Sequence, residues 1–171
     1  LMLLAAGHIA QARAGMLSRT GRCYTFDKRA DGFIKGEACG GVVLQSQHPQ
    51  RTQANLRGRA VKQDGRSASL TAPNGQAQQT LIEEALSTGN LLADQVCLTE
   101  AHGTGTALGD PTEVASLCDA VLRRQMGTRE PLFLSSLKAN TGHAEPAAGM
   151  AGLELLVRKM HLAHTTPNAQ L

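Results

Sequence analysis

Apolar positions in the second half of the chain recur with the spacing of amphipathic helices, and short apolar runs separate these stretches. Ala77, Leu81 and Ala85 follow one another at intervals of four residues, which predicts a helix. The elements expected here alternate between helix and strand, starting with a helix, and span residues 75–88, 96–100, 110–125, 132–137 and 145–161. Strands that alternate with helices form βαβ units on a mostly parallel sheet. The pattern therefore predicts an α/β fold.

The first half of the chain has weaker periodicity. Residues 1–17 are rich in alanine, leucine and glutamine, a composition that favours a helix. The β-branched run within 37–45 predicts a buried strand, and 56–61 predicts a second, short strand. Polar residues over 46–53, and glycine, serine and proline over 63–75, predict loops.

The composition suits one globular domain with few aromatic residues. The 171 residues are 42% hydrophobic and 18% charged, which excludes a disordered tail, a coiled coil and a collagen-like repeat. Four aromatic residues stand against 25 alanines and 18 glycines, so we expect closely packed backbones in the core. We expect no nucleic-acid partner, because reading single strands needs aromatic platforms, and no membrane span, because no apolar run is long enough.

Charge and cysteine usage add two expectations. The net charge is +3, but residues 1–66 carry +7 and residues 67–171 carry −4, which leaves open a solvated surface or a face for an acidic partner. No cysteine pair has CxxC spacing, so we expect reduced, buried thiols in an intracellular, cytoplasmic protein. The chain begins with leucine, and we expect it to be cut from a longer protein. The four cysteines are Cys23, Cys39, Cys97 and Cys118.

The strongest local motif is EAHGTGTALGDPTE, over residues 100–113. It places His102 at the carboxyl end of a predicted strand, before a glycine-rich loop and a helix, and ligand sites in open α/β sheets gather at that edge. Asp110, followed by Pro111 and by Glu113 three positions later, is the pattern of a helix N-cap with a capping box. We therefore interpret both acidic residues as a helix cap and not as catalysts.

A second motif, SLKANTGHAEPAAGMAG over residues 136–152, repeats this arrangement with Lys138 and His143. The two histidines are thus predicted to meet in one cleft. A helix N-terminus disfavours an imidazolium, so His143 should stay neutral and donate an N–H to a developing oxyanion. Two such donors suit enolate chemistry on a thioester. Lys138 would add a positive charge to the site or anchor the loop by a salt bridge.

Other interpretations of these residues are weaker. A single histidine in a glycine-rich loop is more often a turn residue, but two in matched settings favour function. A metal site fails because no two candidate ligands pair on a helix face, and a nucleotide site fails because the glycine spacing is one residue longer than the dinucleotide fingerprint. The remaining histidines have surface or packing roles, and they are His8, His48, His161 and His164.

The two histidine motifs resemble those of β-ketoacyl synthases. The similarity extends to FDKRADGFIKGEACGGVVL (26–44) and KQDGRSASLTAPNG (62–75), and it is closest to the ketosynthase domains of modular type I polyketide synthases. The resemblance implies a partial thiolase-like fold, layered α/β/α/β/α and mostly its C-terminal half. Residues 1–62 would be the end of the N-terminal half of the ketosynthase. Residues 63–171 would be the truncated C-terminal half with both histidine motifs.

The implied activity is that of a 3-oxoacyl-[acyl-carrier-protein] synthase, an acyltransferase of polyketide or fatty-acid biosynthesis. It performs a decarboxylative Claisen condensation of an acyl thioester with a malonyl-type extender on acyl carrier protein. By motif match, His102 and His143 polarise the extender thioester, Lys138 is the lysine five residues before the second histidine, and Thr104 and Thr106 line the pantetheine path. The domain would bind no cofactor of its own, because phosphopantetheine arrives on the carrier protein. The full-length protein would be a homodimer.

The departures from the family pattern concern the missing nucleophile. The family's catalytic cysteine lies in a small-residue motif well over a hundred residues before the first histidine, and none of this chain's cysteines has that setting. The resemblance therefore implies an internal fragment without the nucleophile. Lys35, Ala38 and Pro146 also differ from the usual residues. Two alternatives stay open: a decarboxylase-only or non-elongating ketosynthase, and a carrier-protein-binding module that docks through residues 1–66.

Overall fold

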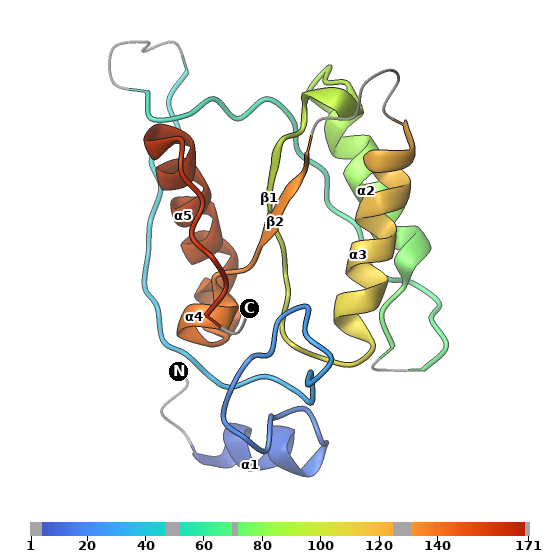
Figure 1. Cartoon of the computed structure of the whole chain (residues 1–171), viewed down its shortest axis with the longest axis vertical. Helices are drawn as coiled ribbons and strands as arrows, with labels where there is room; N and C mark the ends of the chain where they lie inside the picture. Colours follow the sequence, from blue (N-terminus) through green and yellow to red (C-terminus); the bar gives the residue numbers. More distant parts are fainter. Residues whose placement is uncertain (1–4, 47–51, 70–71, 125–130, 170–171) are drawn as a thin grey trace.

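Two short parallel strands lie between helices in this chain (Figure 1). The structure, a computed structural model, describes residues 5–46, 52–69, 72–124 and 131–169. Its α-helices and strands are α1 (Ala5–Arg13), α2 (Gly75–Thr88), β1 (Leu98–Glu100), α3 (Gly109–Ala120), β2 (Phe133–Ser135), α4 (Lys138–Thr141) and α5 (Ala148–Leu162). Short 3-10 turns are η2 (Ala93–Gln95), η3 (Leu122–Arg124) and η4 (Glu145–Ala147).

The strands β1 and β2 run in the same direction, and α3 connects them. Leu98 pairs with Phe133, and Glu100 pairs with Ser135. Figure 1 shows α5 on one side of the strands and α2 with α3 on the other. Both strands end toward the segment that follows α1, so the loops after β1 and β2 share one end of the molecule. The predicted βαβ arrangement on a parallel sheet is therefore confirmed, although both strands are shorter than predicted.

The core forms where α3 packs against α2 and the sheet. Leu117, Ala120 and Val121 are its buried centre. Ala120 and Val121 have no exposed surface, and the absence of a bulky side chain at position 120 lets the neighbouring elements approach closely. The residues that surround this centre are Ile82, Leu86, Ala93, Val96, Leu132 and Leu134. A core of small and aliphatic side chains agrees with the composition.

The helix boundaries follow the sequence pattern closely in α2. That helix spans residues 75–88 as predicted, and the side chain of Asn74 caps it by accepting the N–H of Ala77. The helix predicted over 145–161 is present as η4 followed by α5. The helix predicted over 1–17 is present as α1, with residues 1–4 outside the described part.

Two predicted strands are wrong. Residues 37–45 and 56–61 have no strand structure, and the first segment is not buried, because Val43 is 84% exposed. Val61 in the second segment is 83% exposed. The physical reason is the lack of a partner: a strand needs a neighbour for its backbone N–H and C=O groups, and the strands of the described residues pair only with each other. β-propensity alone does not supply that neighbour.

The thiols also differ from expectation. All four cysteines are free, and Cys23 is buried as predicted. Cys39 and Cys97 are exposed and Cys118 is half-buried, so the prediction of buried thiols is wrong for these three. Cys39 lies in the exposed segment 37–45, where the predicted burial fails with the predicted strand.

Candidate active site

His102 and His143 meet at the carboxyl ends of the two parallel strands. His102 lies two residues beyond β1, and His143 follows β2 and the single turn of α4. Their ring centroids are 5.4 Å apart, with the rings nearly perpendicular at 88°. The rings of Phe33 and His143 also meet edge to face, with centroids 5.1 Å apart and an angle of 71° between the ring planes. The predicted convergence of the two histidines is confirmed.

Glu113 holds the backbone at His102. One oxygen of its carboxylate accepts the N–H of His102 at 2.6 Å, and the other accepts the N–H of Gly103 at 2.8 Å. These are charge-assisted bonds, which are about twice as strong as bonds between neutral groups. The side chain of a helix residue thus fixes the direction in which the His102 loop leaves β1.

Asp110 holds the next part of the same loop. Its buried carboxylate accepts the N–H groups of Gly105 and Thr106 at 3.1 and 3.3 Å. It also accepts the N–H of Phe26 at 2.9 Å, which ties the loop to the segment after α1.

The helix-cap interpretation of Asp110 and Glu113 is therefore wrong. The N-cap position of α3 is Leu108, and the hydroxyl of Thr106 accepts the N–H of Gly109 at 3.2 Å. Positions 110 and 113 are three residues apart on one helix face, and that face carries both carboxylates back to the loop. This spacing is the signal that could have identified them as loop anchors.

Two glycines let the His102 loop fit between its neighbours. Gly103 and Gly105 have φ angles of +44° and +77°, in the left-handed region that side chains disfavour. A Cβ atom on Gly103 would lie 2.6 Å from Cβ of Ser136, and one on Gly105 would lie 2.7 Å from the backbone N of Tyr24. The loop thus has no room for a side chain at either position.

Thr104 and Thr106 already bond within the loop. Thr104 is 6% exposed, and its hydroxyl lies 3.4 Å from the hydroxyl of Thr106. Thr106 is half-buried and, as described, contacts the start of α3. Both threonines follow His102 within four residues of the chain, and their contact with a pantetheine arm stays a prediction.

The segment after α1 holds the His143 loop by backbone pairing. The N–H of His143 donates to the carbonyl of Ile34 at 2.7 Å, and the N–H of Gly36 donates to the carbonyl of His143 at 3.0 Å. A Cβ atom on Gly36 would lie 2.2 Å from the carbonyl oxygen of Thr141, so the two segments need glycine there. This pairing brings residues from the first quarter of the chain against the second histidine motif.

Glu145 determines which nitrogen of His143 carries the proton. Its backbone N–H donates to Nδ1 of His143 at 3.0 Å, so the neutral imidazole carries its proton on Nε2. Glu145 adopts a φ of +47°, and its carboxylate is held by Lys35 at 3.1 Å and by Gln11 at 2.8 Å. The side chain contacts compensate a backbone conformation that non-glycine residues rarely adopt.

Both imidazoles favour the neutral form. Burial is the largest cause that lowers the pKa of His143 to about 4, followed by the charges of Lys138 and His102. The pKa of His102 is also lowered, first by burial and then by Lys138. His102 keeps an exposed surface, yet protein atoms surround its ring closely enough for burial to dominate. Neutrality agrees with the prediction, and burial and the charge of Lys138 are its main causes.

Lys138 lies buried at the start of α4, 7% exposed. Burial lowers the pKa of its ammonium group, and the charges of Glu113 and Glu100 oppose this effect. Among the described residues no carboxylate lies within ion-pair distance of Lys138, so the expected anchoring salt bridge is absent there. The structure instead favours the other expectation, a positive charge that acts on both histidines.

The sequence reasoning missed an ion pair beneath the site. Lys159 of α5 bonds to Glu100, the last residue of β1, and both side chains are buried. The available signal was the helix register: Gly152 and Lys159 are two turns apart on α5 and therefore share a face, and Gly152 packs against Glu100. Lys159 reaches the sheet because that face has no larger side chain at position 152.

The cavities and the metal-ligating side chains of the described residues do not point to a second site. Two surface cavities of about 280 and 590 Å³ are lined by neither histidine. In the part of the chain that the structure describes, no three metal-ligating side chains converge. No helix in that part is long and apolar enough to cross a membrane. The converging side chains, and not a cavity, therefore identify the site.

Two models of one protein family match this chain. The β-ketoacyl synthase C-terminal domain matches residues 53–171, and the β-ketoacyl synthase N-terminal domain matches residues 1–50. The chain belongs to the β-ketoacyl synthase family. The resemblance recognised from the histidine motifs is thereby confirmed. The two family models meet between residues 50 and 53, whereas the division of the ketosynthase at residues 62 and 63 stays a prediction.

The related proteins are polyketide synthases. The chain is 46% identical over 166 residues to one protein of the phenolphthiocerol/phthiocerol polyketide synthase of Mycobacterium tuberculosis, covering 94% of this chain and 8% of that protein. It is 42% identical over 161 residues to another protein of the same synthase from the same species, covering 91% of this chain and 8% of that protein. This β-ketoacyl synthase segment thus spans a small part of the relatives it matches.

Solved ketosynthases share the fold. The ketosynthase from module 6 of the bacillaene synthase of Bacillus subtilis superposes with a TM-score of 0.83 at 27% identity, covering all of this chain and 32% of that one. The oxazolomycin ketosynthase domain from Streptomyces albus gives 0.85 at 30% identity, covering 98% and 30%. The chain therefore has part of a thiolase-like α/β fold, as the motifs implied.

Proposed function

We propose that this chain provides the histidine half of the active site in a β-ketoacyl synthase that extends acyl chains by decarboxylative condensation. The observation that carries this proposal is the neutral pair His102 and His143, 5.4 Å apart at the ends of two adjacent parallel strands. Neutral imidazoles donate N–H groups without bringing a proton that would quench an enolate. Membership of the family and the similarity to polyketide synthases support the same reaction.

The reaction begins with a malonyl-type thioester on the phosphopantetheine arm of an acyl carrier protein. The bond between its α-carbon and carboxylate breaks, carbon dioxide leaves, and the electron pair forms an enolate whose oxygen accepts N–H bonds from both histidines. Nε2 of His143 is the donor on that ring, because Nδ1 accepts the Glu145 N–H. The enolate carbon then attacks the acyl-thioester carbonyl on a cysteine, a new carbon–carbon bond forms, and the cysteine thiolate leaves.

The other site residues support this step in different ways. The charge of Lys138 adds to the effect of burial, which is the larger cause, in keeping both imidazoles neutral, and it attracts the extender carboxylate before carbon dioxide leaves. Thr104 and Thr106 are assigned to the pantetheine path. The chain itself holds no cofactor in this proposal, because the phosphopantetheine belongs to the carrier protein. The acyl-accepting cysteine comes from the part of a complete ketosynthase that this chain does not cover.

The acyl carrier protein is the proposed partner, and residues 1–66 are its proposed docking region because they carry +7. Two of these positive charges are partly neutralised by ion pairs within the chain, because Lys35 pairs with Glu145 and Lys62 pairs with Glu84. Binding that weakens as salt is raised would support the docking region, and affinity independent of salt would contradict it. The homodimer of the complete protein also stays a prediction.

Replacement of the histidines tests the function in the complete protein that carries this chain. His143→Ala should lower condensation on the order of 10²-fold or more, because it removes an oxyanion donor, while the exposed His164→Ala serves as the matched control. Carbon dioxide release from malonyl-carrier protein and formation of the condensed product are measured separately. Near-normal condensation in His143→Ala would refute the role. Carbon dioxide release without a condensed product in the unmutated protein would identify a decarboxylase instead.

A further inference from the structure

A buried ion pair joins α5 to the end of β1 beneath the two histidine loops. Nζ of Lys159 lies 3.1 Å from Oε2 of Glu100, and the two side chains are 3% and 8% exposed. Lys159 also donates to the hydroxyl of Ser135 at 2.6 Å, and that hydroxyl donates to Glu100 at 2.9 Å. The three side chains thus satisfy one another across β1, β2 and α5.

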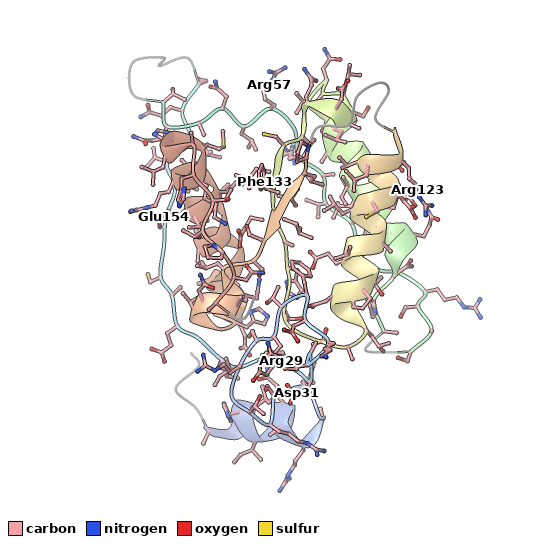
Figure 2. All side chains as sticks on the ribbon, viewed as in Figure 1. Arg29, Asp31, Arg57, Arg123, Phe133 and Glu154 are labelled. Carbon is pink, nitrogen blue, oxygen red and sulfur yellow. The ribbon has the colours of Figure 1, made fainter. Side chains whose placement is uncertain are left out.

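Burial makes this pair different from an ion pair on the surface. Removing two charges from water costs several kcal/mol per ion, and the attraction between them repays the cost only where geometry and hydrogen bonds are good. On the same helix, Arg158 and Glu154 form an exposed pair at 3.0 Å, with Glu154 on the outer side of α5 (Figure 2). An exposed pair of that kind contributes little. The buried pair therefore differs in kind from the exposed one, and its position between two strands and a helix indicates a specific structural role.

The carboxylate of Glu100 has a second partner in the site. Its Oε1 accepts the backbone N–H of Leu137, the residue that directly precedes Lys138 at the start of α4. Glu100 itself lies two residues before His102. One carboxylate therefore belongs to the strand that leads into the first histidine loop and bonds to the backbone that leads into the second.

Lys159 compensates the charge of Glu100. A buried carboxylate that loses its cation is left unpaired, and it finds a new partner only by drawing in water or by moving, and either change weakens its acceptance of the Leu137 N–H. The packing leaves little space for such water, because a Cβ atom on Gly152 would already lie 3.2 Å from Cγ of Glu100. Lys159 is the cation that faces this carboxylate at bonding distance.

We propose that Lys159 is a positioning residue that acts through Glu100 to fix α4, and with it Lys138 and His143, relative to His102. This inference rests on the proposed function for its kinetic consequence. The structural part, the hold of Glu100 on the Leu137 backbone, stands independently of the reaction. Lys159 lies on α5 and contacts no group assigned to the substrate.

The experiment compares three variants of the complete protein. Lys159→Met removes the cation and keeps an unbranched side chain, and Glu100→Gln combined with Lys159→Met makes both positions neutral while the Gln oxygen can still accept the Leu137 N–H. Arg158→Met removes a neighbouring, exposed cation from the same helix and is the matched control. The readouts are kcat and KM for the extender, and hydrogen exchange of the peptide that contains the Leu137 amide.

Lys159→Met should lower kcat about tenfold with KM for the extender within about twofold, because a small displacement of donors weakens the transition state more than substrate binding. The Leu137 amide should exchange faster in this variant and at the original rate in Arg158→Met. The double variant should recover most of the kcat and of the protection, since it removes the uncompensated charge. If Lys159 acts through the carboxylate of Glu100, then neutralising that carboxylate must restore kcat and the protection of the Leu137 amide.

Three results would overturn the proposal. They are an unchanged kcat in Lys159→Met, unchanged exchange of the Leu137 amide in that variant, and a double variant as impaired as Lys159→Met. If Lys159→Met fails to fold, the double variant decides, because loss of kcat and protection in a folded, neutral variant also contradicts the proposal. If the unmutated protein does not condense the substrates, the proposed function fails and the hydrogen-exchange comparison still tests the positioning role.

Discussion

The carboxylate of Glu113 binds the backbone of His102, not its imidazole. The N–H of His102 donates to Oε1 of Glu113 at 2.6 Å, and the adjacent Gly103 N–H donates to Oε2 at 2.8 Å. The helix α3 therefore holds the His102 main chain and leaves the ring free to donate to a substrate oxygen. In the proposed reaction, positioning and chemistry are therefore divided between two residues eleven positions apart.

Glu113→Gln should disturb this arrangement without changing side-chain size. One carboxylate oxygen becomes an NH₂ group, which meets a backbone N–H as donor against donor. We expect a loss of about 1.5–3 kcal/mol in the free energy of unfolding and at least a tenfold loss in condensation rate. Denaturant unfolding and a condensation assay measure the two effects. Glu84→Gln on α2, at an exposed surface pair, is the control and should change neither. An active, equally stable Glu113→Gln would refute the anchoring role.

Gly105→Ala tests the fit of the loop against the segment after α1. The new Cβ would lie 2.7 Å from the backbone N of Tyr24, at a φ of +77° that alanine disfavours. We expect a destabilisation of about 1–3 kcal/mol, read as a lower melting temperature. Gly7→Ala is the matched control, because nothing lies within 4 Å of that Cβ and alanine favours the helix α1. Equal melting temperatures for the two variants would contradict the close packing of the loop.

The pH dependence of decarboxylation should reflect the lowered pKa values of the two histidines. The rate should fall on the acidic side of the pH profile, the acidic limb, only below pH 6.5, because protonated histidines do not support the reaction. The pKa of His143 is about 4, and that of His102 is also lowered. Lys138→Met should move this limb upward, since the Lys138 charge is the second cause of both shifts. Carbon dioxide release between pH 4 and 8 measures the limb, and the residual rate of the variant suffices. Lys62→Met should leave the limb in place; a limb unmoved by Lys138→Met would rule out this role of its charge.

The stability of the folded protein should also depend on His143. Its pKa is about 4 in the fold and 6.5 in its ordinary state, so between these values the unfolded chain binds more protons at this group. The free energy of unfolding therefore rises with pH across this window. The contribution of His143 to it is complete above pH 6.5 and is lost as pH falls toward 4. His143→Ala should flatten this part of the stability profile, measured by urea unfolding at several pH values. The His164→Ala control should retain the slope, and an unaltered slope in His143→Ala would contradict the shift.

The parts of the fold that the sequence predicted are those in which local pattern and tertiary environment agree. The helix α2 begins after Asn74 and repeats its apolar positions along one face, and its predicted bounds are confirmed. The parallel arrangement of β1 and β2 follows from the alternation of strands and helices. The meeting of His102 and His143 follows in turn, because parallel strands end at the same edge.

The incorrect predictions involve partners that are distant in sequence. The valines within 37–45 have strand propensity but no neighbouring strand among the described residues. Asp110 has the position of a helix cap, yet its carboxylate binds Phe26, 84 residues earlier. Lys159 resembles a surface lysine of an amphipathic helix and instead reaches Glu100, 59 residues away. Such bonds depend on which segment meets the helix face. Residue spacing along a helix indicates which residues share a face, but a single sequence does not name the distant residue that the face contacts.

The exposed valines have a consequence for the chain in solution. Val43 and Leu44 are 84% and 75% exposed in an extended segment, and Leu56 and Val61 in the second such segment are 68% and 83% exposed. Apolar extended segments are templates on which further copies add as strands, which is the route to aggregation. Aggregation of the 171-residue chain should therefore depend on its concentration. Light scattering should rise steeply with concentration, and Val43→Asp should suppress that rise.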